Sequence, residues 1–191
     1  MFNLPPVTQA LITLNVLVFL AENALGSPLV SALALWPLGD YFMPWQVLTY
    51  AFVHGNFPHL LFNMFGVFMF GSDLELVWGR ARYLGYYLVC ALSAAATQLL
   101  VASLTGAGYP TVGASGAVFG LLLAFAILFP HRMITPLFPP IPMRAPVFVG
   151  VYAALELVLG VTGTQAGVAH FAHLGGLAGG YLCMRLWQRR Y

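Results

Sequence analysis

Lysine is absent from this chain of 191 residues, and charge of either sign is scarce. Charged residues make up 6% of the sequence and hydrophobic residues 61%. A soluble globular domain carries about 25% charged residues, so this composition excludes a freely soluble protein. Long apolar runs predict an all-α integral membrane protein, because barrel strands would give short segments of alternating hydrophobicity.

Six apolar runs are long enough, or nearly long enough, for helices that cross the bilayer. They span Thr8–Ala24, Phe57–Leu76, Ala81–Ser103, Ser115–Phe129, Pro146–Val161 and Val168–Trp187. Because these runs use most of the chain, we expect one six-helix transmembrane domain over residues 1–191 and no separate soluble domain. The first run lacks a convincing cleavage site, so we expect a retained span and not a signal peptide.

The positive side chains predict the topology. They are Arg80 and Arg82 in the second connection between runs, Arg132 and Arg144 in the fourth, and Arg185, Arg189 and Arg190 at the C-terminal end. With six spans all of them fall on one side of the membrane, which the positive-inside rule makes cytoplasmic. We therefore expect both termini inside. The net charge of +2 then reflects topology and indicates no nucleic-acid partner.

Cysteine is nearly absent, and metal-binding motifs are absent too. Cys90 and Cys183 fall inside separate apolar runs, where we expect inert packing groups. Four histidines near one predicted surface could ligate a metal: His54, His59, His170 and His173. Zinc needs three or four converging ligands with their own supporting partners, and no His-Glu-x-x-His motif is present. We expect no metal and no cofactor.

Polar side chains from three runs are predicted to share one depth. Under this topology the second, fourth and sixth helices start at the outer surface. His59 and Asn63 lie near the first of these starts, Ser115 begins the fourth run, and His173 follows the sixth start by about five residues, so all lie roughly 5–10 Å below the outer boundary. The fourth run is too short for a hydrocarbon core of about 30 Å. Its start would be submerged beside a polar cavity open to the outer side.

Ser115 and His173 are reactive residue types, each placed near glycines in apolar surroundings, and together they suggest a hydrolase that works inside the membrane. Ser115 would be the nucleophile, which needs an adjacent base, and the free N–H groups of its helix start could stabilise an oxyanion. The alternative for Ser115 is a helix cap, and for His173 a packing role. No acidic residue is close to His173 in sequence, so we expect a dyad and not a triad.

A glycine stripe predicts how these two helices meet. His173, Gly176 and Gly180 recur on one face of the sixth helix, and Gly116 and Gly120 offer matching space on the fourth. Small residues let membrane helices approach closely. That approach would bring the imidazole within hydrogen-bond reach of the serine hydroxyl.

His59 and Asn63 lie four residues apart on one helical face, where they could donate to an oxyanion. The alternative is a polar contact between helices. His54 is expected to anchor the first loop.

Two carboxyl groups lie within predicted spans. We expect Glu156 to pair with His170 or stay protonated, in a structural role, and Glu75 to tie down the turn between the second and third helices.

At these motifs the chain resembles the rhomboid intramembrane serine proteases over nearly its whole length. The similar motifs are His54-x4-His59-x3-Asn63, Gly113-Ala114-Ser115-Gly116, Ala172-His173-x-Gly175-Gly176, and the spacing of Gly71, Glu75 and Gly79. They occur in the order that the family has them. The resemblance implies Ser115 as nucleophile, His173 as base, and His59 and Asn63 as groups that assist the oxyanion. It also implies that Phe119 packs on the catalytic imidazole.

The resemblance implies substrates that are single-span helices, cut near the outer membrane boundary. We expect a serine endopeptidase, multi-pass in a bacterial inner membrane, whose partners are such substrates and the lipid bilayer. Two alternatives remain: a non-catalytic rhomboid-like protein that binds membrane clients, and a histidine-lined transporter of metal or solute.

Overall fold

The computed structural model describes residues 4–136, 139–164 and 169–188. The long helices are α1 (Pro6–Leu25), α6 (Arg80–Thr105), α7 (Ser115–Leu128), α8 (Ala145–Thr162) and α9 (His170–Gln188). A further continuous helix runs through α4 (Phe57–Gly66), the π-helical segment η2 (Val67–Gly71) and α5 (Ser72–Trp78). The short elements are α2 (Ser27–Leu33), α3 (Gln46–Thr49), the 3-10 turn η1 (Tyr50–Phe52), and the antiparallel strands β1 (Met133–Ile134) and β2 (Met143–Arg144).

Four of these helices are long and apolar enough to cross a membrane: α1, the continuous helix Phe57–Trp78, α6 and α8. The helix α7 is apolar but shorter, and α9 carries two histidines, four glycines and Arg185. The prediction of an all-α integral membrane protein is therefore confirmed. That all six helices cross the bilayer stays a prediction.

The predicted runs agree with the helices to within a few residues. The start predicted at Val168 lies outside the described residues, and α9 begins at His170. The sequence patterns did not predict α2, α3, η1 or the hairpin of β1 and β2, because short polar-flanked elements carry no apolar periodicity. The π-helical segment at Val67–Gly71 was also not predicted.

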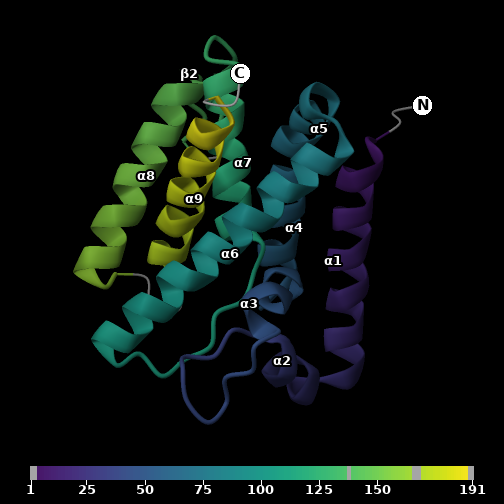
Figure 1. Ribbon diagram of the computed structural model, residues 1–191, viewed down its shortest axis with the longest axis vertical. Helices are drawn as coiled ribbons and strands as arrows, with labels where there is room; N and C mark the ends of the chain where they lie inside the picture. The colour runs from purple at the N-terminus through teal and green to yellow at the C-terminus, as the bar shows by residue number, and fades with distance from the viewer. Residues whose placement is uncertain (1–3, 137–138, 165–168, 189–191) are drawn as a thin grey trace.

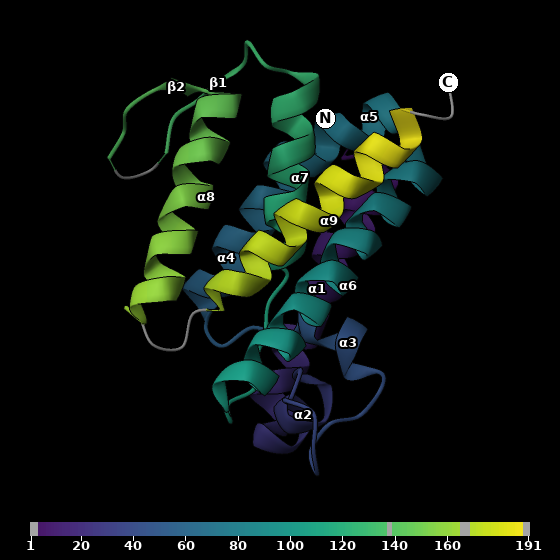
Figure 2. The same ribbon diagram turned by 60° about the vertical axis from the view of Figure 1, so that its left-hand side comes forward.

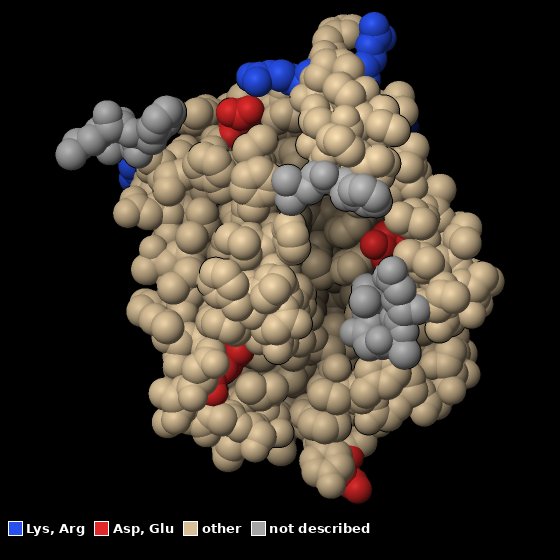
Figure 3. All heavy atoms as spheres, turned by 180° about the vertical axis from the view of Figure 1, so that it is seen from behind, with Lys and Arg blue, Asp and Glu red and all other residues tan. Residues whose placement is uncertain are grey.

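The basic residues gather at one end of the bundle. In Figure 1 the start of α1, the corner between α5 and α6, the hairpin and the end of α9 all lie at this end. The described arginines belong to these segments: Arg80, Arg82, Arg132, Arg144 and Arg185. Figure 3 shows the basic side chains of one face in the same upper region. Arg189 and Arg190 lie outside the described residues.

The helix α9 lies at the centre of the arrangement and contacts α6, α7 and α8. Figure 2 shows it crossing between α8 and α6. Hydroxyl groups of α6 satisfy carbonyls where these helices meet: Ser93 Oγ donates to Gly175 O over 2.8 Å and Tyr86 Oη to Gly120 O over 2.9 Å. These hydrogen bonds join α6 to both α7 and α9.

The carboxylate of Glu75 caps the start of α1. It accepts hydrogen bonds from the N–H groups of Val7 and Thr8, over 2.9 and 2.7 Å, and from the Thr8 hydroxyl over 2.8 Å. The first N–H groups of a helix lack intrahelical acceptors, so a carboxylate there satisfies them. The expectation that Glu75 ties down the next turn along the chain was wrong, because its side chain reaches back to a distant helix.

Candidate active site

Ser115 is the first residue of α7, and its helix start is built by glycine. Gly113 has φ +117°, a conformation that side-chain-bearing residues rarely adopt, and its N–H donates to Tyr50 O over 2.9 Å. The N-cap residue is Ala114, and no side chain caps the helix. The alternative that Ser115 is a helix cap is therefore not what the structure shows.

Ser115 and His173 meet across the contact between α7 and α9. The Ser115 Oγ lies 2.7 Å from His173 Nε2, within hydrogen-bond distance. The Phe119 ring, one turn further along α7, stacks on the imidazole with ring centroids 4.6 Å apart and an angle of 7° between planes. Ser115 is half-buried and His173 is largely buried. The two residues therefore have the geometry of a nucleophile and its base.

Glycines make this meeting possible. A Cβ placed on Gly176 would collide with the backbone of Gly116, and a Cβ on Gly120 would lie 3.2 Å from Gly176 O. The two helices therefore touch backbone to backbone, as the glycine stripe predicts. Gly180 faces Tyr86 and Cys90 instead.

Two side chains were expected to assist an oxyanion. His59 lies beside Ser115, whereas Asn63 bonds within its own helix. A Cβ on Gly113 would lie 2.6 Å from His59 Nε2 and 3.8 Å from Ser115 Oγ, so the His59 ring lies close to the serine. Asn63 is buried, and its amide donates to His59 O over 2.9 Å within the same helix. No hydrogen bond between Asn63 and Ser115 is present among the described residues.

His54 lies in the connection between η1 and α4. Its backbone N–H is 3.3 Å from both carboxylate oxygens of Glu22, and its ring lies edge-on to His59 with centroids 5.0 Å apart. Burial, reinforced by the nearby His59, lowers the pKa of His54 to about 4, which keeps its ring neutral at physiological pH. These contacts agree with the expectation that His54 anchors the first loop.

The sequence analysis predicted only one of the two contacts of Glu156. Its Oε2 lies 2.7 Å from His170 Nδ1, so the expected pairing is confirmed, and the same oxygen lies 2.8 Å from His173 Nδ1. The expectation of a serine–histidine dyad stays a prediction, and the structure adds a carboxylate that contacts the histidine. The available signal was position: Glu156 lies in the last two turns of α8 and His173 in the first turn of α9, on either side of one connection.

Glu156, His170 and His173 are the residues that could hold a metal, since their ligand atoms lie within 4.8 Å of one another. Ligands of a tetrahedral zinc ion, each about 2.0–2.1 Å from the metal, are separated by about 3.3 Å. The separations of 2.7 and 2.8 Å are shorter than this: the first is a hydrogen bond, and the second is a close contact between His173 Nδ1 and the carboxylate. The arrangement as it stands favours hydrogen bonding over ligation.

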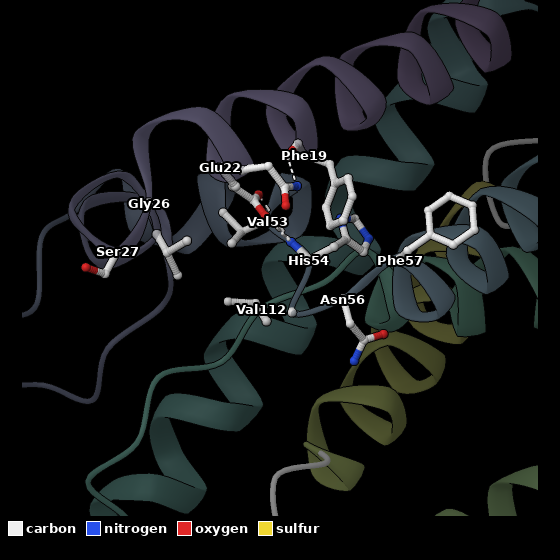
Figure 4. Close-up of a pocket in the computed structure, with 12 residues that line it drawn as sticks. Phe19, Glu22, Gly26, Ser27, Val53, His54, Asn56, Phe57 and Val112 are labelled. Carbon is white, nitrogen blue, oxygen red and sulfur yellow. Dashed lines mark hydrogen bonds between the residues drawn. The ribbon is translucent and has the colours of Figure 1, made fainter.

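A cavity of about 530 Å³ lies next to this site but does not reach the serine. Figure 4 shows it between the end of α1 and the first connection, with Glu22 bonded to the His54 backbone at its wall. Neither Ser115 nor His173 lines it. A separate hollow appears at the centre of the face in Figure 3, with an acidic side chain beside it. A polar cavity above Ser115 stays a prediction.

Comparison with known proteins identifies the family of this chain. The family model of the Rhomboid domain matches residues 41–190. The candidate rhomboid protease YdcA of Bacillus subtilis is 31% identical over 153 residues, which cover 77% of this chain and 71% of YdcA. Rhomboid protein 1 of Saccharomyces cerevisiae, a mitochondrial protein, is 32% identical over 146 residues, covering 72% of this chain and 40% of that protein.

Rhomboid protease GluP of Bacillus subtilis is 28% identical over 139 residues, covering 72% of this chain. The match spans only 25% of GluP, so the chain covers less than half the length of two of these three relatives. The family match nevertheless includes every motif from His54 to Gly176. By this match this chain belongs to the rhomboid family.

Proposed function

We propose that this protein is an intramembrane serine endopeptidase that cleaves transmembrane helices of membrane proteins near the outer membrane boundary. Rhomboid family membership and relatives named as rhomboid proteases support a protease that acts within the bilayer. The observation that carries the serine assignment is the 2.7 Å separation between Ser115 Oγ and His173 Nε2, joined to the imidazole stacking of Phe119.

The proposed topology is one domain of six spans, with both termini cytoplasmic, in a bacterial inner membrane. The gathering of described arginines at the end where α1 starts and α9 finishes supports it. With that orientation the start of α7 points toward the outer side. Ser115 is then submerged, and water for hydrolysis reaches it from outside.

The reaction follows from the two side chains. His173 Nε2 takes the proton of the Ser115 hydroxyl as the oxygen attacks the peptide carbonyl. The imidazole then gives that proton to the leaving amine, and water hydrolyses the acyl-enzyme by the same sequence in reverse. Phe119 keeps the ring plane fixed throughout.

The oxyanion of the tetrahedral intermediate needs donors beside Ser115. The first N–H groups of α7 have no intrahelical acceptor, and they lie at the positive end of the helix dipole. The His59 ring, which packs against Gly113, adds a side-chain donor. Asn63 contributes by releasing its bond to the His59 carbonyl and turning toward the bound substrate, or by holding α4 in place.

The substrates are single-span helices that enter sideways from the lipid. A helical peptide bond is shielded by its own turn, so the segment at the serine must unwind first. Glycine or proline near the cleavage point lowers that cost. We therefore expect faster cleavage of substrates with such residues near the outer boundary.

The test uses purified protein in liposomes with a fluorescent single-span substrate. Wild type is expected to cleave it, and Ser115→Ala to lose at least about 10³-fold in rate. The matched control is Ser103→Ala, since Ser103 is exposed on α6 and bonds only to the carbonyl of its own helix at Leu99. This control should cleave like wild type.

A fluorophosphonate probe separates the enzyme from the alternatives. Wild type should be labelled at Ser115, and Ser115→Ala should not. Equal cleavage by wild type and Ser115→Ala would remove Ser115 from the mechanism. Stoichiometric zinc binding without probe labelling would favour the histidine-lined transporter, and neither activity would favour a client-binding protein.

A further inference from the structure

Glu156 is a buried carboxylate that the two-residue chemistry does not use. It lies on α8, in the part of the bundle that packs against α9, and 9% of it is exposed. A carboxylate within a membrane-spanning helix is costly unless it is paired or functional. Its partners therefore indicate what it does.

Both partners are imidazole nitrogens of α9. The Glu156 Oε2 lies 2.7 Å from His170 Nδ1 and 2.8 Å from His173 Nδ1. The His173 contact is a close ion-pair contact and not a linear hydrogen bond, since its N–H points off the line to the oxygen. No hydrogen-bond partner of His173 Nδ1 appears in the described part of the chain, so the carboxylate at 2.8 Å is the polar group that faces this nitrogen.

We propose that Glu156 is a positioning residue for His173, so that Ser115, His173 and Glu156 act as a three-membered chain. This inference rests on the proposed serine endopeptidase function. His173 contacts the serine through Nε2 and the carboxylate through Nδ1, on opposite sides of one ring. His170 holds the same carboxylate oxygen from the other side and limits its motion.

The carboxylate acts by fixing the tautomer of the imidazole. An acceptor at Nδ1 keeps the proton on that nitrogen, so Nε2 is left free to take the proton of Ser115. When that proton arrives, the carboxylate stabilises the imidazolium by charge. Glu156 stays beside Nδ1 as a charged acceptor and is not itself protonated, and the proton passes from the serine oxygen through Nε2 to the leaving amine.

The experiment compares Glu156→Gln with wild type in the liposome assay. Glutamine has the same shape but no charge, and its amide can donate to Nδ1 and favour the wrong tautomer. We expect kcat to fall about 10²–10⁴-fold with KM unchanged. Glu156→Asp keeps the charge and should retain more activity than Glu156→Gln.

The matched control is Glu75→Gln, which removes an equally buried carboxylate that binds the start of α1. It should lower the melting temperature and leave kcat unchanged. Nitrogen NMR of labelled histidine gives a second readout: wild type should show His173 protonated at Nδ1, and Glu156→Gln should lose that tautomer. If Glu156 had a purely structural role, Glu156→Gln would keep both the wild-type tautomer of His173 and the wild-type kcat.

A wild-type kcat in folded Glu156→Gln, or in Glu156→Asp if the glutamine variant does not fold, would overturn the inference. A second result would also overturn it: wild type binds zinc, Glu156→Gln does not, and the two have the same kcat without zinc. The cluster would then be a metal site. If wild type itself shows no Ser115-dependent cleavage and no fluorophosphonate labelling, the proposed function fails instead. The two failures are therefore distinguishable.

Discussion

The helix α9 has two working faces that are built in opposite ways. Toward α7 it presents glycine, and the backbones of Gly176 and Gly116 touch. Toward α8 it presents His170 and the Nδ1 side of His173, which reach the carboxylate of Glu156, whereas the Nε2 side of His173 meets Ser115 of α7. The first contact is set by shape, and the second by polar side chains.

The two faces also differ in how firmly their neighbours are held. Eight of the 14 residues of α7 are buried within the protein, against four of the 18 residues of α8. Backbone contact leaves almost no freedom, whereas side-chain contacts to a loosely packed helix adapt to small shifts. The serine–histidine distance therefore depends on the α7 face, and the α8 face carries the contacts that can adjust.

The largest predicted effect comes from filling the glycine contact. Gly176→Val would force α9 away from α7, lower cleavage by more than about 100-fold and destabilise the protein by about 1–3 kcal/mol. Gly150→Val is the control on α8, since a Cβ there meets nothing within 4 Å. Cleavage rates and thermal unfolding check both. Comparable losses in the two variants would show that the effect does not depend on the glycine contact between α9 and α7.

An intermediate effect on cleavage is expected from removing an aromatic ring on α7 or on α8. Phe119→Leu removes the ring stacked on His173 and should lower kcat about 2–10-fold, with little change in melting temperature. Phe148 belongs to the apolar cluster between α7 and α8. Phe148→Leu should lower the melting temperature and spare kcat. If Phe148→Leu lowered kcat and Phe119→Leu did not, the position of His173 would depend on α8 and not on α7.

The smallest effect concerns acid. The pKa of His54 is lowered to about 4, so between roughly pH 6.5 and 4 the unfolded chain binds a proton that the folded protein does not. Stability therefore falls as the pH falls through this window, by about 2 kcal/mol between pH 7 and 5. Unfolding measured at both pH values should show this loss in wild type.

His54→Gln should remove most of that acid sensitivity, and His131→Gln, in the exposed hairpin region, should not. If His54→Gln stays as sensitive to acid as wild type, His54 is not the group whose protonation lowers the stability.

Most of the site's residues could be predicted because their signals are local. The spacing of His59 and Asn63, the glycines around Ser115 and the stripe from His173 each follow from helix periodicity. The spans followed from apolar length alone. The short elements α2 and α3 left no such signal, since they have no long apolar face of their own.

The partners of Glu75, and the contact of Glu156 with His173, could not be predicted from spacing. Glu75 binds residues 67 and 68 positions away, at the start of α1. Glu156 reaches His173 only because the connection after α8 turns α9 back beside it. Nothing local to either carboxylate encodes these distances.

The sequence by itself determined three things: that this chain is a membrane protein, which of its segments form the long helices, and which serine and histidine could react. Apolar length and residue periodicity are properties of single segments, so they can be read without a fold. Only the tertiary structure decided that Glu156 lies against the imidazole of His173 and that Asn63 bonds within its own helix. Those facts depend on how helices rotate and cross, and packing of the whole bundle sets both.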